Sequence, residues 1–250
     1  MNTPIRLIAA VILFGSLAGC AQATPSPVPP AETPAVNSTQ EYTVNIDPAD
    51  FADVIDNPYF PLAPGTKYVY EGKTADGLER VEVEILRETR EVMGITATIM
   101  RDTVYLDGEL VEDTYDWYAQ DKAGNVWYLG EDVSNYENGQ LKDKAGSWEA
   151  GVAGALPGII MFADPAVHVG ETYRQEYYKG HAEDMADLLS VTESVGVPYG
   201  SFENVVKTLD YTPLEPDLRE HKYYAKGIGP VKTVDLTTGE EVVLVEFTAP

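Results

Sequence analysis

The chain has 250 residues, with 17 Lys and Arg against 41 Asp and Glu, which gives a formal net charge of -24. This charge excludes nucleic acid and anionic lipid as partners, because both would be repelled. The chain has a single cysteine. No disulfide can form within it, so any folded domain must be held together by its own hydrophobic core.

The first residues have the organisation of an export signal. Arg6 supplies a positive charge, residues 7–14 form an uncharged apolar run, and small residues follow at 17–20. The run is too short to cross about 30 Å of hydrocarbon as a permanent helix. We therefore expect residues 1–19 to be a signal peptide.

The tetrad Leu17-Ala18-Gly19-Cys20 resembles the lipobox of bacterial lipoproteins, in which the cysteine is acylated and becomes the new N-terminus. The resemblance implies that Cys20 carries palmitate or a similar acyl group and that the membrane is a partner. Two or more acyl chains anchor a protein stably. Ala21 stands where Asp would indicate retention at the inner membrane, so an outer membrane is favoured if the bacterium has one. The alternative is an ordinary cleaved signal followed by an unrelated cysteine.

Residues 20–40 read as a tether. After Cys20 they are mainly Pro, Thr, Ser and Ala, and Glu32 is their only charge. Such a composition cannot bury enough apolar surface to offset the entropy of ordering. We expect a lipid anchor and an extended tether over 20–40, followed by a single β-rich envelope domain over 41–250.

The domain is predicted to begin with a short helix and to continue as a series of strands. Pro48 suits a first helical position, and Phe51, Val54 and Ile55 have helical spacing, so we expect a helix over 48–55. Alternating apolar residues and turn dipeptides such as Asp107-Gly108 then predict antiparallel hairpins. The expected strands cover residues 66–71, 79–88, 95–105, 110–120, 125–130, 171–178, 188–197, 202–211, 221–225, 230–236 and 242–247.

The alternation is lost between Gly146 and Val169, where the sequence is rich in Gly and Ala. We interpret this stretch as a long covering loop with a small apolar plug at 159–162, because long loops in compact domains are often functional. A pocket is expected between the loop and the sheet, with His181 and His221 at its rim. The alternative is that the loop only seals the core.

Several segments resemble bacterial secreted proteins and lipoproteins of uncharacterised activity, and the resemblance spans nearly all of residues 47–247. The segments that carry it are Ile55-Asp56-Asn57-Pro58-Tyr59-Phe60-Pro61-Leu62, Pro64-Gly65-Thr66, residues 115–121, residues 197–202 and residues 220–225. The layout is similar to envelope domains such as lipoprotein carriers, whose curved antiparallel sheet forms a half-barrel. The resemblance implies a mainly β, half-barrel-like curved meander with one short N-terminal helix and a covering loop. It implies no activity.

No motif indicates an enzyme. The sequence has no Gly-rich phosphate loop, no G-x-S-x-G and no H-E-x-x-H. We therefore expect a non-enzymatic binding or scaffold protein outside the cytoplasm, with a small-molecule or peptide ligand and an unidentified cofactor, if any.

The first candidate site is an aromatic hairpin. A four-residue turn at 121–124 would pair Tyr118 with Trp127 and Trp117 with Tyr128 on opposite faces. Aromatic side chains on both faces are typical of a core with a cover, or of one face lining a ligand groove.

The second candidate is the acidic segment around His181 and Asp184. Together with His221, these residues offer nitrogen and oxygen ligands to a divalent metal, although the spacing matches no strong metal motif. The alternative function is therefore a metal-binding protein or metal-dependent hydrolase that uses His181, Asp184 and His221. A solvated acidic turn explains the same residues.

Replacing Cys20 by Ser should release the protein from membranes, because the substitution removes the site of acylation. We expect the wild-type protein to enter the detergent phase in a phase-partitioning experiment and Cys20→Ser to remain in the aqueous phase. A wild-type protein found wholly in the aqueous phase would contradict the lipid anchor.

Overall fold

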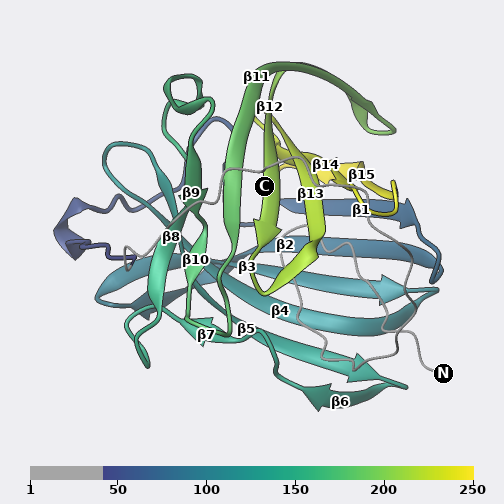
Figure 1. The fold of residues 1–250 in the computed structure, drawn as a ribbon, viewed down its shortest axis with the longest axis horizontal. Helices are drawn as coiled ribbons and strands as arrows, with labels where there is room; N and C mark the ends of the chain where they lie inside the picture. Colours follow the sequence, from purple (N-terminus) through teal and green to yellow (C-terminus); the bar gives the residue numbers. More distant parts are fainter. Residues whose placement is uncertain (1–41) are drawn as a thin grey trace, which may run out of the picture.

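The computed structural model describes residues 42–250, which form one antiparallel sheet of 15 strands (Figure 1). The predicted signal peptide, Cys20 and the tether lie outside the described residues. Within 42–250, no helix has both the length and the apolar character needed to cross a membrane. The mainly β, antiparallel fold expected from the sequence is confirmed.

The main path of the sheet runs β10-β8-β5-β4-β3-β2-β1-β15-β14-β13-β12-β11-β9, with β6 and β7 paired to β5. The strands are β1 (Lys67–Lys73), β2 (Leu78–Val92), β3 (Ile95–Leu106), β4 (Glu109–Gln120), β5 (Val126–Glu137), β6 (Gln140–Asp143), β7 (Trp148–Glu149), β8 (Leu156–Met161), β9 (Thr172–Arg174), β10 (Glu176–Tyr177), β11 (Met185–Val197), β12 (Gly200–Thr212), β13 (Glu215–Ala225), β14 (Gly229–Asp235) and β15 (Glu241–Thr248).

Strand alternation gives the sheet an inner and an outer face. On β2, Val81, Val83 and Ile85 are buried, whereas the intervening Glu82 and Glu84 are not. Side chains two residues apart on a strand share a face, so one face packs on the core and the other meets water. This pattern confirms the strand predicted over 79–88. The single strand expected over 171–178 is wrong, because this segment is divided into β9 and β10 at opposite ends of the strand order.

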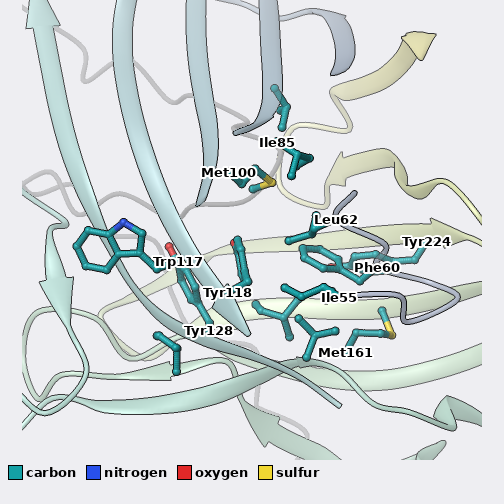
Figure 2. Packing of buried hydrophobic residues seen from close by; sticks show 14 of the residues in the cluster. Ile55, Phe60, Leu62, Ile85, Met100, Trp117, Tyr118, Tyr128, Met161 and Tyr224 are labelled. Carbon is teal, nitrogen blue, oxygen red and sulfur yellow. The ribbon is translucent and has the colours of Figure 1, made fainter. Parts of the chain in front are cut away.

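The sheet curves so strongly that its two halves face each other. The ring of Phe60 lies 5.3 Å from that of Tyr118 on β4 and 6.4 Å from that of Tyr224 on β13. Figure 2 shows Phe60 next to Leu62 and between these two tyrosines. The two ends of the strand order, β9 and β10, are separated only by Gln175. One short segment therefore brings the edges of the curved sheet together.

The N-terminal segment contains only a three-residue 3-10 helix, Pro48–Asp50, so the helix expected over 48–55 is wrong beyond this first turn. The chain instead extends, because Asn57 and Gln120 fix it to the sheet. Gln120 Oε1 accepts hydrogen bonds from the backbone N–H groups of Asp56 and Asn57. The Asn57 side chain donates to the carbonyls of Gly124 and Phe162.

The covering loop expected over 146–169 is also corrected. It contains β7, β8 and a 3-10 helix, η2 (Pro165–His168), and β8 pairs with β5 as part of the sheet wall. Gly158 explains why a Gly-rich segment suits this place. A Cβ atom there would lie 2.4 Å from the carbonyl oxygen of Arg174. Close backbone approach, rather than a loose loop, selects the glycine.

Phe60→Ala should destabilise the domain by about 3–5 kcal/mol, because it leaves a cavity between the two halves of the sheet. Val54→Ala is the matched control in the same segment. Val54 is 60% exposed, so its loss should change the unfolding free energy by no more than about 0.5 kcal/mol. Urea unfolding of both variants measures the difference, and equal stabilities would contradict the role of Phe60.

Candidate functional site

The interior has two chemically different ends. At the apolar end, residues 47–62 lie across the turns, where the backbone N–H groups of Gly227 and Lys122 donate to the carbonyls of Pro58 and Asp50. The opposite end, called here the acidic end, contains the turns at residues 74–77, 107–108, 213–214 and 236–240. Hydrogen bonds join these turns too, as from Ala75 N to Glu240 Oε1.

Buried carboxyl groups gather toward the acidic end. Ten Asp and Glu residues are buried in the described chain, namely Glu79, Asp102, Glu112, Asp116, Glu131, Glu176, Asp184, Asp210, Glu220 and Asp235. Asp102 and Asp116 share the inner face with Met100 and Tyr118, each two positions away, and Glu220 shares it with Tyr224, four positions away. Carboxyl groups are rarely buried without pairing. This concentration is therefore the most unusual chemical feature of the domain.

Some of these carboxyl groups have neutral hydrogen-bond donors. The Tyr128 hydroxyl donates to Asp116 Oδ1 at 2.6 Å, and the Thr114 hydroxyl donates to Glu112 Oε1 at 2.9 Å. On the other half of the sheet, Gln175 Nε2 donates to Asp210 Oδ2 at 3.2 Å. These donors satisfy only part of the acceptor capacity of the carboxyl groups.

Other oxygens in the cluster have no hydrogen-bond partner. Both carboxyl oxygens of Asp102 lack one, although Asp102 is only 1% exposed. The same holds for Glu112 Oε2, Asp116 Oδ2 and Glu131 Oε2. Buried acceptors without partners are costly, and here they accumulate on the three neighbouring strands β3, β4 and β5.

Lys222 is the only buried basic side chain among residues 42–250. Its ammonium group lies 3.3 Å from Asp210 Oδ2 and 3.8 Å from Glu220 Oε2. These two carboxyl groups raise the pKa of Lys222 above its usual value despite the opposing effect of burial. One side of the cluster thus already contains a permanent ammonium counter-charge.

Burial raises the pKa values of several of these carboxyl groups, because a low-dielectric interior disfavours the charged carboxylate. The pKa of Glu112 rises to about 8 and that of Asp116 to about 7. Burial followed by repulsion from Glu112 raises the pKa of Asp102, and burial followed by repulsion from Glu176 raises that of Glu131. Burial also raises the pKa of Asp184 to about 7 and that of Glu220 to about 8, against the opposing effect of Lys222.

A small pocket lies next to residues 60–62, and no Asp or Glu side chain of the described chain lines it. Residues 60–62 cover it, and Tyr68, Tyr70 and Met100 are among the side chains that line it. Its free space of about 10 Å³ is enough for about one water molecule. Val83, also in its wall, pairs with Asp102 across β2 and β3, which connects the pocket wall to one residue of the carboxyl cluster.

The aromatic hairpin has a different register from the one expected. The turn has five residues, closed by a hydrogen bond from Asp121 N to Asn125 O, so Tyr118 pairs with Tyr128 and Ala119 with Trp127. A bulge then places Trp117 opposite Gly130. The sequence pattern did not reveal the longer turn or the bulge.

The division of the four aromatic candidates between the two faces of the sheet therefore differs from the one expected from the sequence. Tyr118 and Tyr128 stack in the interior with ring centroids 4.7 Å apart. Trp117 lies on the other face beneath Arg90, whose guanidinium carbon is 3.9 Å from the Trp117 ring centroid. Trp127 packs against Phe51. Of the four, only the two tyrosines lie on the inner face with the carboxyl cluster.

The expected metal set of His181, Asp184 and His221 does not come together. His181 stacks on Tyr178 at a turn, Asp184 is buried beside Lys222, and His221 lies on the outer face of β13 next to Tyr223. Within residues 42–250, no three His, Cys, Asp or Glu side chains are grouped so that they could hold a metal ion. The expected metal site of His181, Asp184 and His221 is therefore not found among the described residues.

The carboxyl cluster was not predicted from the sequence, where the acidity of the chain served only to exclude nucleic acid and anionic lipid as partners. A signal was present in the strand parity. Asp102 lies two residues from both Met100 and Val104, and Glu79 lies two residues from Val81. Each acidic residue therefore shares a face with apolar, inward-facing residues. Searching predicted strands for acidic residues at apolar positions would have identified both.

Comparison with known proteins identifies no family for this chain. No protein-family model and no curated protein matches the chain. Among solved structures, the chain is similar to a protein of Parabacteroides distasonis described as a "putative lipoprotein", with 16% sequence identity and a TM-score of 0.42. The similarity covers 79% of this chain and 100% of that one.

The raised pKa values predict a domain that becomes less stable as the pH rises. A carboxyl group with a raised folded-state pKa binds protons more tightly in the folded state, so its stabilisation is present below the unfolded-state pKa and is lost as the pH passes the folded-state value. We expect the unfolding free energy to fall by several kcal/mol between about pH 4.5 and pH 8. Thermal melts across this range measure it.

Glu112→Gln and Asp116→Asn should make this pH dependence shallower, because each removes one buried titrating group. Asp132→Asn should leave it unchanged, because Asp132 is half exposed and pairs with Lys144 on the outer face. Stability that rises with pH, or an equal effect of all three variants, would show that the buried carboxyl groups do not cause the pH dependence.

Proposed function

We propose that this chain is a lipid-anchored binding protein of the bacterial cell envelope that holds a small ligand inside its curved sheet. The N-terminal export signal, the lipobox-like tetrad ending at Cys20 and the tether support the location. In a bacterium with two membranes, Ala21 favours the outer one. The tether would keep the folded domain clear of the membrane surface.

The observation that supports ligand binding is the set of buried carboxyl oxygens without hydrogen-bond partners. A domain selected for stability alone would not place Asp102, Glu112 and Asp116 close together in its interior, because their mutual repulsion and desolvation oppose folding. Groups that are costly to the free protein are expected where a ligand later satisfies them. The loss of folding stability that these buried carboxyl groups cause therefore supports a ligand site in the interior.

A binding role accounts for these features better than catalysis does. The interior combines carboxyl groups with Thr, Tyr and Gln donors, and the sequence contains none of the nucleophile or metalloprotease motifs sought. The second expectation, a metal-dependent hydrolase at His181, Asp184 and His221, is not supported because these side chains are dispersed.

The full-length protein, purified in detergent, should be stabilised by a small molecule that enters the interior. A thermal-shift screen of cationic, neutral and anionic compounds tests this, followed by affinity measurements on two β4 variants. Asp116→Asn changes the inner wall, and Asp113→Asn changes an outer residue that is paired with Arg101. The dissociation constant should change about tenfold for the inner variant only, as expected for loss of one charged hydrogen bond.

Two results would contradict the proposed function. The first is a screen in which no compound raises the melting temperature. The second is a compound whose affinity responds to Asp113→Asn and not to Asp116→Asn, since that compound would bind the outer surface.

A further inference from the structure

Buried carboxyl groups occur on strands all along the curved sheet, and together they are called here the ring. In strand order the ring contains Glu176 on β10, Glu131 on β5, Asp116 and Glu112 on β4, Asp102 on β3, Glu79 on β2, Glu220 on β13 and Asp210 on β12, with Asp184 directly before β11. The ring therefore includes both halves of the sheet. Its carboxyl groups are spread along the wall rather than concentrated at one point.

The ring already binds one alkylammonium group, that of Lys222. This ammonium group forms ion pairs with Asp210 on β12 and Glu220 on β13. No second buried basic side chain occurs among the described residues to pair with the carboxyl groups on β3 to β5, which are those of Asp102, Glu112, Asp116 and Glu131. An ammonium group offers three hydrogen-bond donors, which suits the unpartnered oxygens of Asp102 and its neighbours.

The spacing of the ring favours several ammonium groups over a single metal ion. A metal ion needs its ligand atoms within about 2–2.6 Å of one point, and no such group of donors occurs within residues 42–250. Val81 and Val104 lie on the inner face between Glu79, Asp102 and Glu112. Such apolar surface suits the methylene chain that separates the charges of an organic polyamine.

We infer that the ligand of the proposed interior site is a linear organic polyamine, whose ammonium groups pair with Asp102, Glu112, Asp116 and Glu131. The inference rests on the proposed function and names its ligand class. The oxygens that would bind the ligand are shielded from water in the free protein. Entry therefore requires side chains at the acidic end to move, so association should be slow.

Spermidine is the probe, used with the full-length protein in detergent at about 0.15 M salt, where the Debye length of about 8 Å screens contacts with surface charges. The melting temperature of the wild-type protein should rise by about 5 °C or more when spermidine is present at about 100 times its dissociation constant. Magnesium and calcium chloride at matched ionic strength should produce a smaller rise.

The matched variants are Glu131→Gln and Asp132→Asn, neighbours on β5 that face inward and outward. Glu131→Gln and Asp102→Asn should each weaken spermidine binding about tenfold or more, whereas Asp132→Asn should not. Neither inner substitution is expected to unfold the domain, because each relieves repulsion within the ring. Their melting temperatures without spermidine verify this.

Three outcomes would overturn the inference: no shift with spermidine, a shift as large with magnesium or calcium, or equal weakening by Asp132→Asn and Glu131→Gln. Interior binding of a neutral or anionic compound in the screen described above would also overturn it while leaving the proposed function intact. If no compound binds in the interior, both the proposed function and the polyamine inference are wrong.

Discussion

The contact of Phe60 with Tyr118 and Tyr224 is the interaction on which the rest of the structure depends. These two tyrosines come from β4 and β13, which belong to opposite halves of the sheet, and Phe60 packs against both. An antiparallel sheet of this size has an inner face that must be kept from water. Residues 55–62 fill that face at the apolar end and so allow the sheet to remain strongly curved.

The apolar packing also creates the chemistry of the other end. With one end of the interior filled by apolar side chains, the carboxyl groups beyond Met100 and Tyr118 lie in a medium that solvates charge poorly. Their pKa values rise and several of their oxygens remain without partners. The same curvature that buries the core therefore assembles the candidate site, and the cost of that site is carried by the stability of the core.

Most of the long strands could be predicted from the sequence, whereas β6, β7, β8 and the division between β9 and β10 could not. The candidate site could not be predicted either. The predicted strand over 95–105 is β3, Ile95–Leu106, because the alternation of inward and outward residues follows from the geometry of the strand itself. The segment containing β8 was read as a loop because Gly158 and Pro157 weaken the local pattern. Its place in the sheet depends on backbone contact with residues 174–175, which are adjacent to it only in the fold.

The sequence alone determined the acidic composition and which residues of each strand share a face, and it predicted an export signal, because these properties depend on neighbours along the chain. Only the tertiary structure decided that Asp102, Glu112, Asp116 and Glu131 meet in one interior. Their meeting depends on the register between strands, and a five-residue turn and a bulge at Gly130 each shift that register by one residue. A shift of one residue changes which side chains lie opposite each other on neighbouring strands. The backbone groups that form hydrogen bonds between those strands belong to residues that are distant in the sequence.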